Sequence, residues 1–332
     1  MATRYSVNGR NGQSGISLVE VMVAMLIGLI LMSGVVQVFT SARLSNRVQD
    51  ATARMQETGR MALEIISRDA RMADFWGCAS DVDNVVNHLD TGGTDFIDFG
   101  AGGIGGAEGA GLTPDTIVFR GGANVGLGLQ PPYGPDTAAG LNIPTGSGLE
   151  QEDVVFIADC ESADVFQIAN TDTDTSGVIA HTTVGSLDPG NVNASDPGCP
   201  GANAHCLSKI YGSDATVFLA TQVTYSIAVG SEGEPALFRD GDELLDGVED
   251  LQVLFGEDTD GSGTANYFVR ADEVVDMGQI VSIRFAVVTR SYEDNLTGGV
   301  NQTYTVLGQN FTAPDERLRQ VYTTTVNVRN RL

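Results

Sequence analysis

Oxygen-bearing side chains recur at alternate positions in one acidic, glycine-rich segment of the sequence. Asp258, Asp260 and Ser262 stand at positions one, three and five of this segment, Gly263 follows at six, and Asn266 stands at nine. This is the oxygen spacing of an EF-hand calcium loop, in which residue seven contributes a backbone carbonyl. Position five is Ser rather than Asp, and position twelve is Val269 rather than a bidentate Glu. The sequence therefore predicts a weak calcium site, and the alternative is an acidic turn without an ion. The predicted ligands are Asp258, Asp260, Ser262, Thr264 and Asn266, with Glu257, Asp272 or Glu273 as candidates for the missing position.

Four cysteines lie outside the apolar N-terminal segment, at Cys78, Cys160, Cys199 and Cys206. An even number without a CxxC pair favours two disulfides in an oxidising compartment over a zinc site, for which His205 is the histidine beside a cysteine. Four cysteines allow three connectivities. We expect Cys199–Cys206, because closing a short loop costs the least entropy, and Cys78–Cys160 as the remaining pair.

Motifs of catalysis are missing from the sequence. The only lysine, Lys209, does not stand in a P-loop, and no GxSxG, HExxH or dinucleotide-binding fingerprint occurs. His88, His181 and His205 lie in polar segments, where we expect solvated side chains. The sequence therefore predicts a protein that is not an enzyme.

Charge is distributed unevenly along the chain. The net charge is −25, and 38 of the 43 acidic residues lie in residues 73–332. A body this acidic repels nucleic acid and anionic lipid headgroups. We therefore expect a solvated surface that binds no nucleic acid.

An apolar run extends from Ile16 to Phe39 and contains one charged residue, Glu20. As a helix, with a rise of about 1.5 Å per residue, this run crosses a bilayer's hydrocarbon core of about 30 Å. A carboxylate inside such a segment costs about 2.5–3.5 kcal/mol on insertion scales, so Glu20 is a candidate functional residue. The alternative is a plain single-span anchor. Arginines on both sides of the run leave its orientation open.

The start of this run reads Gly15-Ile16-Ser17-Leu18-Val19-Glu20 and resembles the class III signal of type IV prepilins. The resemblance implies that prepilin peptidase cleaves between Gly15 and Ile16 and that Ile16, which departs from the usual Phe, becomes the N-methylated first residue. It also implies that Glu20 meets the N-terminal ammonium of a neighbouring subunit in the filament, where the paired charges lose much of their burial cost.

Beyond the apolar run, a stripe with spacings of three and four residues predicts that the helix continues to about Ala73. The stripe consists of Leu44, Val48, Ala51, Met55, Thr58, Ala62, Ile65, Asp69 and Met72. The same stripe would suit a coiled coil. After Trp76 the period becomes that of strands, which we expect at 116–120, 154–158, 165–169, 216–229, 236–239, 250–255, 279–290, 302–307 and 320–329. Glycine-rich segments at 100–111 and 121–148 predict loops. The predicted fold class is α+β and pilin-like: a long N-terminal helix packed on an antiparallel β-sheet head with a large loop-rich insertion.

The segment from Phe255 to Val269, the following strand and the ending Thr323–Arg331 resemble the PilW group of minor pilins. We therefore expect a leader at 1–15, a transmembrane half-helix at 16–39, an amphipathic half-helix at 40–75 and a head at 76–332 with an insertion at about 79–215. The resemblance implies a minor pilin that takes part in initiation or tip assembly of type IV pili, structures that serve adhesion and twitching motility. The implied partners are other minor and major pilins, prepilin peptidase and the inner-membrane assembly platform. The precursor would be a single-pass bacterial inner-membrane protein with a periplasmic head, later exposed on the pilus. The alternatives are a large pseudopilin of type II secretion and a pilus-tip adhesive module.

Overall fold

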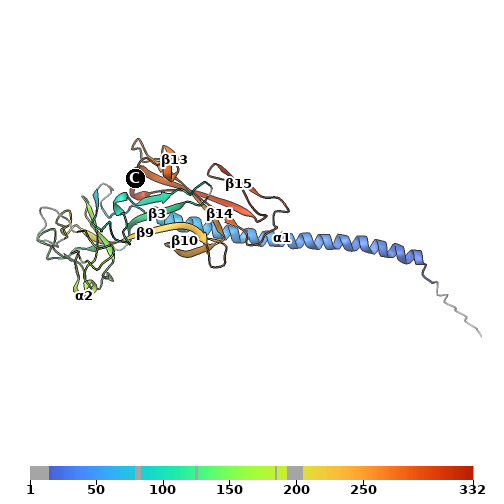
Figure 1. Cartoon of the computed structure of the whole chain (residues 1–332), viewed down its shortest axis with the longest axis horizontal. Helices are drawn as coiled ribbons and strands as arrows, with labels where there is room; N and C mark the ends of the chain where they lie inside the picture. The colour runs from blue at the N-terminus through green and yellow to red at the C-terminus, as the bar shows by residue number, and fades with distance from the viewer. Residues whose placement is uncertain are drawn as a thin grey trace, which may run out of the picture. The chain divides into compact units, whose positions relative to one another are not determined.

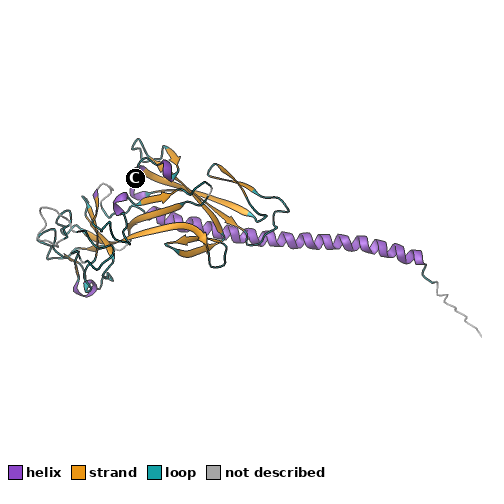
Figure 2. Cartoon of the chain, in the orientation of Figure 1, coloured by secondary structure: helices purple, strands orange, loops and turns teal. Residues whose placement is uncertain are grey.

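The structure is a computed structural model that describes residues 15–78, 84–111, 113–123, 126–183, 185–192 and 205–331. The chain forms two compact units, Met1–Ala51 and Thr52–Leu332. One long helix, α1 (Leu18–Met72), belongs to both, and the second unit is the head (Figures 1 and 2). The predicted helix is therefore confirmed, and its observed ends lie within two residues of those expected.

The part of α1 inside the head buries one narrow face. Its buried residues are Met55, Gly59, Ala62, Ile66, Ser67 and Ala70, spaced by three and four apart from the adjacent pair 66–67. The predicted stripe is thus right for Met55 and Ala62 but wrong for Met72, which is 39 % exposed. Most of the face consists of small residues, which allow the strands to approach the helix closely. Asp69, the polar member of the predicted stripe, accepts hydrogen bonds from Tyr225 and Arg239.

The strands of the head have the following bounds: β1 (Val85–Asn87), β2 (Ile104–Ala107), β3 (Thr116–Gly122), β4 (Leu127–Gly128), β5 (Leu141–Asn142), β6 (Val154–Ala158), β7 (Ala163–Gln167), β8 (Val178–Ile179), β9 (Thr216–Val229), β10 (Pro235–Arg239), β11 (Asp242–Asp246), β12 (Val248–Glu257), β13 (Tyr267–Val269), β14 (Ile280–Arg290), β15 (Thr303–Val306), β16 (Gln309–Thr312) and β17 (Arg319–Asn327). A short helix, α2 (Thr173–Ser176), and 3₁₀ turns at Phe99–Ala101, Ala271–Glu273, Met277–Gln279 and Arg329–Arg331 complete the elements.

Among the described residues these strands form two main sheets. One sheet has the order β1-β7-β6-β9-β10-β11, with β3 and β4 also paired to β9 and β2 paired to β3. The other has the order β13-β12-β14-β17 and is antiparallel. Two-stranded pairs β15-β16 and β5-β8 lie outside them. The expectation of one antiparallel sheet is therefore wrong in two respects: there are two main sheets, and β1 pairs with β7 in parallel.

Strand β9 is shared between two regions of the head. Its first residues, from Thr216 to Leu219, pair with β4 and β6, whereas the residues from Ala220 onward pair with β3 and β10. Figure 1 shows the loop-rich region around α2 at one end of the head and β3 and β10 alongside α1. One strand thus carries backbone pairing from the loop-rich region into the sheet that covers the helix.

The two regions have separate hydrophobic cores. The helix-and-sheet core joins Ala62, Ile66 and Ala70 of α1 to residues of β3, β9, β10, β12, β14 and β17. The loop-rich region has a core of its own around Val155, Phe166, Ile179 and Val217. A third cluster, which contains Trp76 and Phe156, lies where the chain leaves the helix.

The predicted strands correspond closely to the long observed ones. Strands β6 and β9 have the expected bounds, while β7 begins and ends two residues earlier than predicted. The glycine-rich segments are less irregular than expected, because β2 lies in the first and β4 and β5 lie in the second. Strand β3 lies within the expected insertion, and yet its Ile117 and Phe119 belong to the helix-and-sheet core.

Candidate functional site

The residues of the predicted cleavage junction lie just before α1. Gly15, Ile16 and Ser17 are exposed and have no regular secondary structure, and the side chain of Ile16 is 75 % exposed. The first helical hydrogen bond joins the Val21 amide to the Ser17 carbonyl over 3.2 Å. The Gly15–Ile16 junction is therefore exposed and non-helical, and α1 begins two residues after it.

Glu20 lies in the first turn of α1 and is exposed. A carboxylate in this turn is stabilised by the unpaired amides and the positive end of the helix dipole. Cleavage after Gly15 would leave Glu20 as the fifth residue, one helical turn from the new ammonium group. At this position the carboxylate could pair with a cation that lies level with the N-terminal end of a neighbouring helix.

The helix that carries Glu20 is long and apolar enough to cross a membrane. Its most apolar window has a mean hydropathy of 2.4, and none of that window is buried within the described structure. Side chains such as Leu18, Leu29 and Val38 are more than two-thirds exposed. An exposed apolar surface of this length requires a lipid or protein environment.

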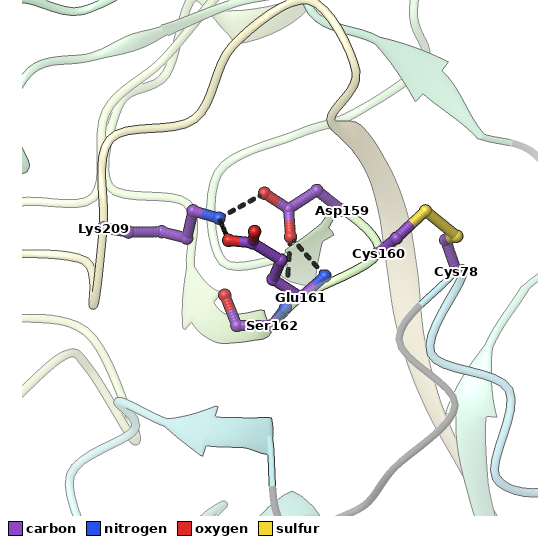
Figure 3. The surroundings of a disulfide bond; sticks show 6 residues. All are labelled: Cys78, Asp159, Cys160, Glu161, Ser162 and Lys209. Atoms are coloured by element: carbon purple, nitrogen blue, oxygen red, sulfur yellow. Dashed lines mark hydrogen bonds and ion pairs between the residues drawn. A yellow bond between two sulfur atoms is a disulfide. The ribbon is translucent and has the colours of Figure 1, made fainter.

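A disulfide joins Cys78 to Cys160, with the Cα atoms 4.5 Å apart (Figure 3). Cys78 follows the end of α1 and Cys160 follows β6, so the bond ties the helix end to the loop-rich region. Beside it, the Lys209 ammonium lies 2.7 Å from Asp159 and 2.6 Å from Glu161, and these carboxylates raise the pKa of Lys209 (Figure 3). Cys206 is also disulfide-bonded. Its predicted partner, Cys199, lies outside the described residues, so that pairing stays a prediction.

The predicted calcium loop connects β12 to β13 and is closed by hydrogen bonds from its own backbone. The Asp258 carboxylate accepts the amides of Asp260, Ser262 and Gly263, the last at 2.6 Å. Asp260 accepts the Ser262 amide and the Asn266 side chain. The loop thus brings Asp258, Asp260 and Asn266 together, and the hydroxyls of Ser262 and Thr264 lie 2.9 Å apart.

These residues fit a calcium ion only in part. Each carboxylate oxygen has a second lone pair that could bind a cation, but the described residues contain no group of three or more His, Cys, Asp or Glu side chains arranged to hold a metal. Position twelve, Val269, lies in β13, and Glu257 is buried with its carboxylate accepting the amides of Val275 and Asp276. Beyond the carboxylates of Asp258 and Asp260, an ion would therefore depend on neutral oxygens, and the calcium site stays a prediction.

Comparisons with known proteins match both ends of the chain. Residues 10–36 match the family model of the prokaryotic N-terminal methylation motif, and residues 224–330 match the family model of the type IV pilus-assembly protein W, PilW. The chain therefore carries a prepilin-type N-terminal methylation motif and a PilW domain. The first match contains Gly15, Ile16 and Glu20, and the second runs from within β9 to the end of β17 and the turn after it.

A search of curated proteins found no match. Among solved structures, a type IV-like pilin from Thermus thermophilus matches at 8 % identity, with a TM-score of 0.37, over 84 % of this chain and 97 % of that one.

The prediction that the three histidine side chains are solvated is wrong. His88, His181 and His205 are buried, with 7 %, 1 % and 1 % of their surfaces exposed. They come from three separate segments and meet beside the buried carboxylate of Asp164. No local pattern in the sequence marks them, because residues 88, 181 and 205 are brought together only by the tertiary fold.

Proposed function

We propose that this chain is a minor pilin that takes part in initiation or tip assembly of type IV pili. The observation that carries the proposal is the combination of an accessible Gly15–Ile16 junction, the exposed Glu20 one turn into an apolar helix, and a PilW match over the sheet side of the head. Prepilin peptidase would cut after Gly15 and release Ile16 as an N-methylated first residue. The chain would then pass from an inner-membrane precursor with a periplasmic head into the filament beside other pilins.

The proposed role of Glu20 is electrostatic. In a filament the N-termini of neighbouring helices lie in an apolar bundle, where an unpaired ammonium is costly. A carboxylate on the adjacent helix lowers that cost, and it does so only when the register of the two helices brings the charges together. Glu20 would therefore select the axial position of the incoming subunit as well as stabilise it.

The test is to replace Glu20 by Ala in cells that assemble the filament. We expect a normal cleavage product that starts at Ile16, a head of unchanged stability and a strong loss of surface pili. Glu64→Ala is the matched control, because Glu64 lies on the same helix, is 77 % exposed, and pairs with Arg68 only at 4.0 Å. Normal piliation with Glu20→Ala would overturn the charge-pairing role. Loss of protein secretion without loss of pili would identify a type II secretion pseudopilin instead.

Processing is tested separately by mass spectrometry of the membrane-bound protein. We expect a mature N-terminus at Ile16 with one added methyl group. A chain that begins at Met1 would contradict processing by prepilin peptidase, and with it the assignment to a pilus.

A further inference from the structure

All three histidines of the chain meet in one buried cluster of the loop-rich region. The Nδ1 atoms of His181 and His205 lie 2.9 Å apart, and the His205 ring also makes an edge contact with His88, with ring centroids 4.7 Å apart. His88 follows β1, His181 follows β8, and His205 precedes the segment that carries Leu207 and Tyr211 into the loop-rich core. The cluster therefore fastens three segments to one another.

The hydrogen bonds allow one arrangement of protons on His181 and His205. Nε2 of His181 lies 3.0 Å from the carbonyl oxygen of Ala139, so Nε2 must donate. The neutral His181 ring then has its lone pair on Nδ1, and Nδ1 of His205 must donate to it. The lone pair of His205 is left on Nε2, which is buried and has no hydrogen-bond partner among the residues that the structure describes. A second proton on His181 would meet the Nδ1–H of His205, and a second proton on His205 would find no acceptor among the described residues.

The charged side chains described around the cluster already have partners of their own. Asp164 is wholly buried, and its carboxylate already accepts hydrogen bonds from His88, Ser208 and Tyr211. Burial alone would raise the pKa of Asp164, but these donors outweigh burial and lower it. The other charged groups nearby, Asp159, Glu161 and Lys209, pair with one another.

We propose that the histidine cluster is an acid-sensitive latch, which opens the loop-rich region of the head when the pH falls below about 6.5 while the helix-and-sheet core stays closed. The direction of the pH effect follows from the difference in proton binding between the open and closed forms. Burial lowers the pKa of His181, and burial together with the neighbouring histidines lowers the pKa of His205 to about 3. The open form therefore binds protons that the closed form excludes, and the latch weakens as the pH falls from 6.5 towards 3.

The helix-and-sheet core responds to acid in the opposite direction. No histidine belongs to it, and it packs around β12, where burial raises the pKa of Asp250 to about 6. A carboxyl whose pKa is raised in the folded state gains stability as the pH falls through that range. As the pH falls, the loop-rich region would therefore lose stability while the helix-and-sheet core gains it, although the two regions share strand β9.

The test is hydrogen–deuterium exchange of the full chain in detergent micelles at pH 7.5, 6.5 and 5.5, with chelator present and rates corrected for intrinsic exchange. For peptides that cover 139–146, 177–182 and 205–211, we expect protection to fall by roughly 5- to 30-fold between pH 6.5 and 5.5, a factor of about five for each histidine that takes up a proton only in the open form. Peptides of β14 should keep or gain protection. An equal change in both sets of peptides, or no change in either, would overturn the proposal.

Two variants separate proton uptake from packing. His181→Gln can donate to Ala139 and accept from His205 without taking up a proton, so the loss of protection between pH 6.5 and 5.5 should become smaller, by up to about five-fold. His205→Phe removes the other group and keeps an aromatic ring against His88. Ile179→Val is the control, because it weakens the same core without a titrating group and should leave the pH dependence unchanged. Two histidine variants that both retain the full pH dependence would overturn the proposal.

Discussion

The Asp74 carboxylate, two residues beyond the end of α1, forms an ion pair with the Arg331 guanidinium near the end of the chain. Both side chains are almost completely buried, at 2 % and 5 % exposure. Asp74 also accepts the Trp76 indole N–H at 2.8 Å and the Gly103 amide at 2.7 Å, while Arg331 donates to the carbonyl of Ile280. One pair of residues thus joins the helix end to β14 and to the loop that leads into β2.

Replacement of Arg331 by Met should destabilise the head by about 3–5 kcal/mol, because it leaves the Asp74 carboxylate buried without its charge partner. Urea unfolding of the full chain in detergent micelles, followed by the fluorescence of the single, buried Trp76, measures the change. Arg329→Met is the control, since Arg329 is exposed. If both variants unfold at the same urea concentration, the Asp74–Arg331 ion pair contributes nothing to the stability of the head.

Replacement of Gly59 by Ala should destabilise the head although Ala favours helix by about 1 kcal/mol. A Cβ atom at residue 59 would lie 2.3 Å from ring carbons of Tyr322 and 2.8 Å from its Cγ, so the ring would have to change rotamer or the strand would have to shift. We expect a net loss of about 1–2 kcal/mol after the helix gain is subtracted. Gly34→Ala is the control, because no atom lies within 4 Å of that position.

A double-variant cycle tests the cause of that loss. Tyr322→Ala should remove most of the additional cost of Gly59→Ala, because the overlap disappears with the ring. Additive losses in the double variant would show that Gly59 is needed for some reason other than its contact with Tyr322.

Replacement of Asp250 by Asn should stabilise the head at pH 7.5 by about 1–3 kcal/mol. Burial and the nearby Asp115 raise the pKa of Asp250 to about 6, so its charged form is the costly one. The gain should shrink as the pH falls from about 6 and vanish below about pH 3.8, the ordinary Asp pKa, where wild-type Asp250 becomes protonated in both states. The amide keeps the 3.0 Å hydrogen bond from Gln252. Urea unfolding across this pH range gives the profile.

The adjacent Glu249 differs from Asp250 because its carboxylate is paired with arginine side chains. Its carboxylate receives the Arg319 guanidinium at 2.5 and 2.8 Å and Arg290 at 3.3 Å. Glu249→Gln should therefore destabilise the head at pH 7.5. A gain in stability from both variants would mean that the whole acidic surface, rather than the burial of Asp250, causes the effect.

Calcium should raise the melting temperature of the head if the loop between β12 and β13 binds it. The expected affinity is that of extracellular sites, about 10⁻⁴–10⁻³ M, because only Asp258 and Asp260 contribute charge. The melting temperature of the wild-type chain should be higher in millimolar calcium than in chelator. Asp260→Asn should remove this difference, whereas Asp214→Asn, at an exposed position, should keep it. Identical melting curves of the wild-type chain in calcium and in chelator would show that the loop is an acidic turn stabilised by its own amides and binds no calcium.

Periodic and local features of the fold could be predicted from the sequence. The long helix and strands β6 and β9 follow from runs of apolar residues with a clear period, and such runs depend on neighbours in the sequence. The histidine cluster, the Asp74–Arg331 pair and the parallel pairing of β1 with β7 could not be predicted, because each joins residues separated by tens to hundreds of positions. Gly59 shows the same limit: its cost to the helix is visible in the sequence, but its contact with Tyr322 is not.

Strand β9 has a consequence for any attempt to shorten this protein. The segment before it looks removable, yet β3 lies inside that segment and packs on the helix, while the first four residues of β9 pair only with strands from it. Excision of residues 79–215 would expose the β9 backbone and remove part of the wall around Ala62 and Ile66. The loop-rich region is therefore not a transplantable module: a graft onto another pilin would have to carry β2, β3 and the whole of β9 with it.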